Sequence, residues 1–328
     1  MPAQAVVDDL AGEPAVLRIE GDWTGVDDDA VAFLARTPLV TLAVGPAPPA
    51  IAAACDLATN DPAEADRWCE GIGRAPYAAL AAALLVRHAP TNVEAGLIAE
   101  STTYSLLQAG PEFAAWRAAH MSRGDPDPDA PRIRVGRDGP VAELVFVRPE
   151  RHNALDTRMR DELYAALARL SVEDPAPVIV RGEGPSFCSG GDLGEFGTFP
   201  GVVESHVLRL ARSPARGFAA LANRLVVGVH GATIGAGIEL AAFAGTVLAA
   251  DDARIGLPEL GLGLVPGAGG TVSVSRRAGR QRTLELLYTD ETIDAETAAA
   301  WGLVDEVVPG AELDDRLRQV ASRASVRP

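Results

Sequence analysis

Short apolar runs alternate with helix-like stretches along the second half of the chain. Buried strands are predicted at residues 141–147, 178–180, 225–229 and 246–250. A helix is predicted after a plausible N-cap at Asp156, with its apolar face formed by Met159, Leu163, Leu167 and Leu170. Strands that alternate with helices indicate right-handed crossovers and a mostly parallel sheet, so the predicted fold class is α/β.

The first third of the chain is less regular. Strands are predicted at residues 15–20 and 39–44, and a short helix is predicted between them at residues 30–36. Two longer helices follow from Pro76, which suits a first helical turn. Their apolar stripes are Tyr77, Leu80 and Leu84 in the first, and Val93, Leu97, Tyr104 and Leu107 in the second, which ends at Gly110-Pro111.

One segment has the composition of a linker. Residues 124–131 read GDPDPDAP, in which proline alternates with aspartate and no apolar periodicity is present. This segment predicts a boundary between an N-terminal region, residues 1–123, and a C-terminal core, residues 132–328.

Composition and charge narrow the possible partners. The 328 residues are 48% hydrophobic but only 5% aromatic, which favours closely packed helices. The net charge is −16 and every basic residue is arginine, which argues against a nucleic-acid partner because that would need a basic surface. A small polyanionic ligand is still possible, because a few arginines and backbone amides can hold phosphates.

The cysteines and the apolar runs bear on the compartment. Cys55, Cys69 and Cys188 are odd in number and lack metal-ligand spacing, so we expect a reduced, cytoplasmic protein without a metal site. The N-terminus lacks the features of a signal peptide, and no uncharged apolar run reaches membrane-spanning length. We therefore expect no contact with a membrane.

Two glycine-rich turns are candidates for binding a ligand through backbone amides. The first, FCSGGDL, spans residues 187–193. The second, HGATIGAGIEL, spans residues 230–240 and leads from a predicted strand into a helix, where N–H groups are unpaired. Read alone, the first could be a tight turn, and the second could only allow close helix–strand packing. The second does not match a dinucleotide fingerprint.

Two glutamates lie in apolar surroundings. Glu239 falls in the first turn of the apolar helix, and Glu259 is the only ionisable residue between Arg254 and Arg276. Burial would raise the pKa of Glu259 and make it a proton donor. The alternatives are a glutamate that interacts with the helix dipole for Glu239, and a solvent-facing loop residue for Glu259.

Five blocks in this order and at these separations resemble the crotonase (enoyl-CoA hydratase/isomerase) superfamily over residues 132–312. They are RPERHNALD (148–156), FCSGGDL (187–193), GATIGAGIEL (231–240), LPELGLGLVPGAGGT (257–271) and AETAAAWGLVDEVVP (295–309). The resemblance implies a crotonase spiral of repeated ββα units with helical cover. It also implies an acyl-coenzyme A (CoA) thioester as substrate, no metal or redox cofactor, and a homotrimer or hexamer.

The resemblance assigns roles to residues of each block. The N–H groups of Ser189 and Ala236 would form an oxyanion hole for the thioester carbonyl. CoA would be bound by His152, Asn153 and Ala154, which would lie along adenine and pantetheine, and by Ser189, Gly190, Gly191, Asp192, Leu193 and Gly235. Glu239 would act as the base, and Glu259 would deliver a proton to the α-carbon.

The chain departs from the family pattern in four respects. Ala236 and Gly245 stand where glycine and aspartate are usual, and the lysines often used on CoA phosphates are absent. The chain also ends about twenty residues after residue 309, before the helices that usually cover the acyl pocket. The segments RAPYAALAAALLVRH (74–88) and NVEAGLIAESTTYSLLQAGPEFAAW (92–116) resemble those helices.

We therefore predict a permuted or duplicated arrangement. Residues 75–120 would cover their own core or a neighbour's, and residues 1–70, which include the family-like ACDLATND, would be a degenerate crotonase-like remnant. The alternative is an unrelated helical cap. Phe196, Phe199 and Trp116 are candidates for lining the acyl pocket.

The reaction expected from two glutamates is hydration of a 2-enoyl-CoA, or the reverse. An enoyl-CoA isomerase, an acyl-CoA hydrolase or a cofactor-independent oxygenase could use the same site. A non-catalytic acyl-CoA-binding subunit is the alternative of another class, which the unusual Ala236 leaves open.

Overall fold

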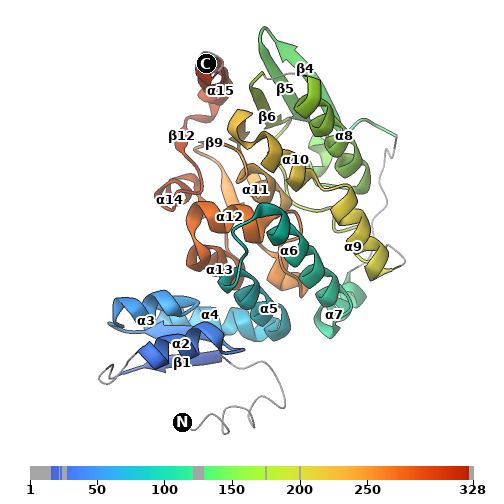
Figure 1. Ribbon diagram of the computed structural model, residues 1–328. Coiled ribbons are helices and arrows are strands. Elements are labelled where there is room, and N and C mark those ends of the chain that lie inside the picture. Colours follow the sequence, from blue (N-terminus) through green and yellow to red (C-terminus); the bar gives the residue numbers. More distant parts are fainter. Residues whose placement is uncertain are drawn as a thin grey trace.

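The computed structural model of the chain describes residues 16–21, 23, 28–120, 129–173, 176–198 and 201–324 (Figure 1). Its second half contains a six-stranded sheet with the order β12 (Glu306–Val308), β9 (Thr246–Ala250), β7 (Leu225–Val229), β6 (Val178–Gly182), β5 (Val141–Phe146) and β4 (Ile133–Asp138). All neighbours run parallel except β4, which pairs antiparallel with β5. The four predicted strands of this region and the α/β fold class are confirmed.

Apolar side chains of this sheet alternate between two cores. One face, with Val141, Ile179 and Val226, packs against Leu313 and Leu317 of α15 (Leu313–Ala324). The opposite face belongs to the main core, together with α8 (Thr157–Glu173) and α10 (Pro214–Leu221). Asp156 caps α8 as predicted, because its Oδ1 accepts the Met159 N–H at 2.6 Å.

A smaller sheet carries the second glycine-rich turn. In it, β10 (Arg254–Gly256) lies between β8 (Ala232–Ile234) and β11 (Ile293–Asp294). The remaining helical elements of the described second half are α9 (Val202–Ala211), α11 (Ala236–Ala241), η3 (Glu259–Leu262), α12 (Gly270–Ala278), α13 (Arg280–Thr289) and α14 (Ala295–Ala300), with short 3-10 turns at η1 (Pro149–Arg151), η2 (Ala222–Arg224) and η4 (Gly310–Glu312).

The N-terminal region begins with a small sheet and continues as helices. Its strands β1 (Val16–Glu20), β2 (Val40–Val44) and β3 (Leu57–Thr59) are parallel. Its helices are α2 (Asp28–Arg36), α3 (Pro49–Ala54), α4 (Pro62–Arg74), α5 (Pro76–Arg87), α6 (Val93–Gln108) and α7 (Pro111–Ala119). The strands and helices predicted there are confirmed, and the strand resemblance of residues 54–61 falls on β3.

The predicted stripe of α5 is wrong, whereas that of α6 is largely right. Tyr77 is 45% exposed, and the buried face of α5 consists of Ala78, Ala79, Ala82, Ala83 and Val86. Small side chains let α5 approach α13 closely, so that the Tyr288 hydroxyl donates to the Ala79 carbonyl at 3.0 Å. In α6, Leu97, Tyr104 and Leu107 are buried as expected, and Val93 is half-buried.

The N-terminal helices cover the core of their own chain. Figure 1 shows α5, α6 and α7 beside α9, α12 and α13, and helix contacts join α6 to α9 and α12, and α5 to α12 and α13. Buried side chains of both regions form one continuous main core. The cover predicted for residues 75–120 is therefore supplied within the chain. The origin of residues 1–70 and the boundaries at 123 and 132 stay predictions, and residues 124–128 lie outside the described residues.

No single described helix is long and apolar enough to cross a membrane. The pair α4 and α5 meets the length and composition criteria together but is bent by 111°. All three cysteines have free thiols, and Cys55 and Cys188 are buried.

Candidate active site

One cavity brings together most of the predicted site. Its volume is about 350 Å³. Both glycine turns and both glutamates line it, through Ser189, Gly190, Gly191, Asp192, Leu193, Gly235, Ala236, Glu239 and Glu259. The N-terminal region also lines it, through Tyr104 and Gln108 of α6. The cavity therefore lies where α6 meets the core.

Hydrogen bonds in the first glycine turn identify its free amide. The Ser189 N–H donates to the His152 carbonyl at 2.9 Å, so it is not available to a ligand, and its predicted oxyanion role is corrected. The Gly190 carbonyl accepts from Leu155 N at 2.8 Å. Because C=O and N–H of one peptide plane point in opposite directions, the Gly191 N–H points away from Leu155. It has no acceptor within the described part of the chain.

The second glycine turn presents an amide from the other side. Ala236 is the first residue of α11, and its N–H has no acceptor among the residues that the structure describes. Gly235 has φ +48°, and a Cβ there would lie 2.6 Å from Oε1 of Glu259. Only glycine therefore suits position 235, and its lack of a side chain lets Glu259 approach the turn closely. The Ala236 methyl group is accommodated in a buried position.

Glu239 is held at the N-terminus of α12. It is 2% exposed, and its Oε2 accepts the N–H groups of Ala268 at 2.7 Å and Gly270 at 2.9 Å. Burial raises its pKa well above the ordinary value, and the nearby carboxyl groups of Glu259 and Glu100 raise it further. The two amide bonds act in the opposite direction, because they stabilise the carboxylate.

Glu259 is buried without full hydrogen bonding. It is 8% exposed, and its Oε2 has no partner among the described residues. Burial raises its pKa to about 8, with smaller contributions from Glu100 and Asp290. An unsatisfied buried carboxyl oxygen is costly, so this group is poised to bond to a ligand or exchange a proton with it.

A third buried carboxyl group, Glu100 of α6, lies beside Glu239. Its oxygens accept the Gly269 N–H at 2.7 Å, the Thr271 N–H at 2.9 Å and the Thr271 hydroxyl at 2.6 Å. Glu239 and Glu100 thus accept hydrogen bonds from alternate backbone amides of residues 268–271. Burial raises the pKa of Glu100 to about 7.

The sequence reasoning missed Glu100, although a signal was present. Glu100 falls between Leu97 and Tyr104 on the apolar face of α6, where a carboxyl group is unexpected. Arg209 of α9, which also lines the cavity, was missed as well. No motif or periodicity in the sequence marks Arg209. Its partners lie more than a hundred positions away in the sequence, so only the fold brings them together.

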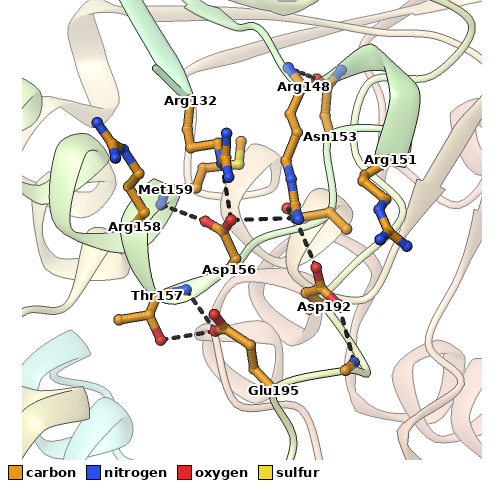
Figure 2. Close-up of polar contacts among 12 residues, drawn as sticks. Arg132, Arg148, Arg151, Asn153, Asp156, Thr157, Arg158, Met159, Asp192 and Glu195 are labelled. Carbon is orange, nitrogen blue, oxygen red and sulfur yellow. Dashed lines mark hydrogen bonds and ion pairs between the residues drawn. The ribbon is translucent and has the colours of Figure 1, made fainter. Parts of the chain in front are cut away.

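The segment before α8 has a mainly structural role, as Figure 2 shows. The Asp156 carboxylate accepts from Arg132 Nε at 2.9 Å, and Arg148 bonds to Asp192 at 2.8 Å (Figure 2). Asn153 is fully buried, with its Oδ1 on the Arg148 N–H and its Nδ2 on the carbonyls of Glu183 and Ser186. The predicted CoA contact therefore cannot involve the Asn153 side chain.

The neighbours of Asn153 stay candidates for CoA contact. His152 is exposed and has Nδ1 2.9 Å from the Ser186 hydroxyl. The Ala154 carbonyl accepts from Arg148 at 2.9 Å, and none of residues 152–154 lines the cavity.

The aromatic candidates lie as a small cluster near the cavity. Phe196 lines it, and Trp116 of α7 packs edge-on against Phe196 with centroids 6.2 Å apart. Phe199 lies outside the described residues. No group of three or more potential metal-ligating side chains is present in the described ranges.

Comparisons with known proteins identify a family for most of the second half of the chain. Residues 136–327 match the family described as enoyl-CoA hydratase/isomerase. A probable enoyl-CoA hydratase of Rhodobacter capsulatus is 36% identical over 57% of this chain and 73% of that protein. One of Mycobacterium bovis is 32% identical over 59% of this chain and 75% of its own length.

Solved structures show the same fold. An enoyl-CoA hydratase of Bacillus anthracis matches with a TM-score of 0.56 and 30% identity, over 60% of this chain and 77% of that chain. A putative enoyl-CoA hydratase of Thermobifida fusca in complex with acetoacetyl-CoA matches with a TM-score of 0.54 and 32% identity, over 60% and 82%.

Proposed function

We propose that this chain, which belongs to the enoyl-CoA hydratase/isomerase family, adds water to a 2-enoyl-CoA ester or removes it. The observation that carries the proposal is one cavity lined by two buried glutamates and by two glycine-rich turns with free amides. The crotonase resemblance itself is confirmed by the family match and the solved structures.

The oxyanion hole is formed by the N–H groups of Gly191 and Ala236. Both amides are unpaired within the described residues, and both belong to turns that face the same cavity. When a nucleophile adds to C3 of an enoyl thioester, negative charge develops on the thioester oxygen. Fixed N–H donors stabilise that charge without reorganising during the reaction.

The two glutamates divide the proton transfers. Because burial raises the pKa of both, and Glu259 raises that of Glu239 further, the pair holds a shared proton near neutral pH. The amide bonds to Oε2 place the negative charge on Glu239, which removes a proton from water as its oxygen attacks C3. Glu259 gives its proton to C2, so that water is added across the double bond.

Substitution of Glu239 tests this proposal. Loss of the base in Glu239→Gln should lower hydration of crotonyl-CoA by about 100- to 10,000-fold, measured as loss of the conjugated thioester absorbance. Glu296→Gln, in the first turn of α14, serves as a control that should keep full activity. Unchanged activity in Glu239→Gln would contradict the assignment, and retained isomerisation of 3-enoyl-CoA by that variant would favour an isomerase relying on Glu259.

The solved structures support the nature of the ligand, and exposed side chains bear on the assembly. Two Thermobifida fusca structures are described as complexes with acetoacetyl-CoA and with CoA, which supports an acyl-CoA ligand for this chain. We also propose a homotrimer or hexamer. Large apolar side chains exposed on α6 and α9 would suit burial between copies: Ile98, Leu106, Val203 and Val207.

A further inference from the structure

Arg209 is a cation built into the wall of the cavity. Its guanidinium carbon lies 4.3 Å from the centroid of the Tyr104 ring. Its Nε donates to the Ser101 hydroxyl at 3.0 Å, and its Nη2 donates to the Ser105 hydroxyl at 2.7 Å. One helix of the N-terminal region therefore fixes this side chain through three neutral contacts.

The charge of Arg209 has no counter-charge in contact with it. No carboxylate lies within 4.0 Å of Arg209 in the described part of the chain, and its Nη1 has no acceptor there. Glu100 interacts electrostatically with Arg209, but its oxygens accept hydrogen bonds from Gly269 and Thr271. Burial lowers the pKa of Arg209, which reflects the cost of keeping a desolvated cation.

The surroundings of Arg209 suit an anion carried by a ligand. A guanidinium group binds a carboxylate through a planar fork of N–H donors, and partial burial strengthens such bonds. Arg160 of α8 lines the same cavity, and its Nε and Nη2 both bond to Asp161. Phe196, Leu208 and Leu262 supply apolar wall for methylene groups.

We propose that Arg209 binds a carboxylate at the far end of the acyl group, so that the preferred substrate is an acyl-CoA ester of a dicarboxylic acid. This inference rests on the proposed function for the position of the thioester. Tyr104, Ser101 and Ser105 act as positioning residues in this proposal, because they hold the guanidinium group of Arg209. Specificity for the acyl group is thereby set at the contact between α6 and α9.

Two other roles for Arg209 give different results. It could balance the charge of the buried glutamates, in which case its loss would change the pH profile equally for all acyl groups. It could also only fasten α9 to α6, in which case its loss would lower stability and affect all substrates alike. A contact with the CoA phosphates would weaken binding of CoA itself.

The test compares matched substrates. Carboxylated 2-enoyl-CoA esters with one, two or three methylenes between C3 and the carboxylate are paired with neutral esters in which an isopropyl group replaces the carboxylate. For the best-fitting length, we expect kcat/KM to favour the carboxylated ester by about 10- to 100-fold. Arg209→Gln should remove this preference, mostly through KM, so that the carboxylated and the neutral ester have similar kcat/KM.

Two further variants separate specificity from folding. Arg209→Lys keeps the charge without the fork and should retain part of the preference. Arg212→Gln is the control, because Arg212 follows α9 and pairs with Asp161 on the surface. Thermal unfolding of each variant shows whether a loss of activity has a structural cause.

The inference and the proposed function can fail separately. Equal kcat/KM for carboxylated and neutral esters in the native protein, with turnover of both, would overturn the inference alone. No turnover of any ester would count against the proposed function. In that event calorimetric binding of saturated carboxylated and neutral acyl-CoA esters still decides the role of Arg209, since equal affinities would overturn it.

Discussion

At the scale of single residues, the site brings together three buried carboxyl groups. Glu100, Glu239 and Glu259 are each less than a tenth exposed, and burial raises the pKa of all three. Protonation of one lowers the cost of ionising the others. The protonation state of these three carboxyl groups therefore affects both the reaction and the stability of the protein.

The raised pKa of Glu259 predicts that this residue lowers the stability of the protein at high pH, although activity depends on it. In the unfolded chain a glutamate ionises near pH 4.3, whereas the folded protein holds the Glu259 proton up to about pH 8. The folded state therefore binds more protons between these values, and its stability falls as pH rises through this range. Glu259→Gln has no carboxyl group to titrate at this position, so it avoids this loss. Its free energy of unfolding, relative to that of the native protein, should rise by at least about 1 kcal/mol between pH 5 and pH 8.

Thermal or urea unfolding at the two pH values measures this difference. Hydration activity of Glu259→Gln should be lost under both conditions, and Glu296→Gln should show no pH-dependent gain. A difference between Glu259→Gln and the native protein that stays constant from pH 5 to pH 8 would contradict the assigned pKa.

Glu100 predicts a shift in the pH profile. Its carboxyl group raises the pKa of Glu239, so Glu100→Gln should move the acidic limb of kcat/KM to lower pH. The limb moves in this direction because Glu239 would lose its proton more readily. Glu94→Gln, on the exposed first turn of the same helix, should leave the profile in place. An acidic limb that does not move, in a variant that folds normally, would show that Glu100 is only structural.

At the scale of elements, close approach between helices depends on small residues. Gly71 of α4 has no space for a side chain, because an added Cβ would lie 1.7 Å from the Tyr288 carbonyl oxygen of α13. Gly73, two positions later on α4, has nothing within 4 Å. The same helix therefore carries a glycine that the packing requires and one that it does not.

This pair predicts opposite effects of one substitution. Gly71→Ala should push α4 away from α13 and destabilise the protein by about 1–3 kcal/mol. Gly73→Ala should stabilise it by about 0.5–1 kcal/mol, because alanine favours the helical backbone. Urea unfolding of the two variants measures both values. Equal effects would contradict the close contact between α4 and α13.

The elements that the sequence predicts well are those with local causes. Strands such as β5 and β7 are short apolar runs, and Asp156 caps α8 through an amide three residues away. The Ser189 amide was assigned wrongly because its partner, the His152 carbonyl, lies in another segment. The stripe of α5 failed for a related reason. Its alanines are buried by a helix that is distant in sequence, and tertiary contact overrides side-chain size.

At the scale of the whole molecule, the N-terminal region is part of the site. Its helices share the main core with the rest of the chain, and α6 contributes Tyr104 to the cavity and Glu100 to the segment that holds Glu239. Arg280 and Gln281 of α13 also donate to the Cys55 carbonyl beside the small sheet. The family blocks lie in residues 148–309, yet the site that they form is completed by residues outside them.

Removal of residues 1–123 is therefore expected to abolish both folding and activity. The remaining chain would expose the faces of α9, α12 and α13 that now contact α4, α5 and α6, and it would lose the carboxylate acceptor for the Gly269 and Thr271 amides. Size-exclusion chromatography and hydration of crotonyl-CoA measure the two consequences. Residues 1–123 supplied as a separate chain during expression should restore soluble material if the interface is sufficient to reassemble. A soluble, fully active remainder without that segment would instead make the N-terminal region an independent cap.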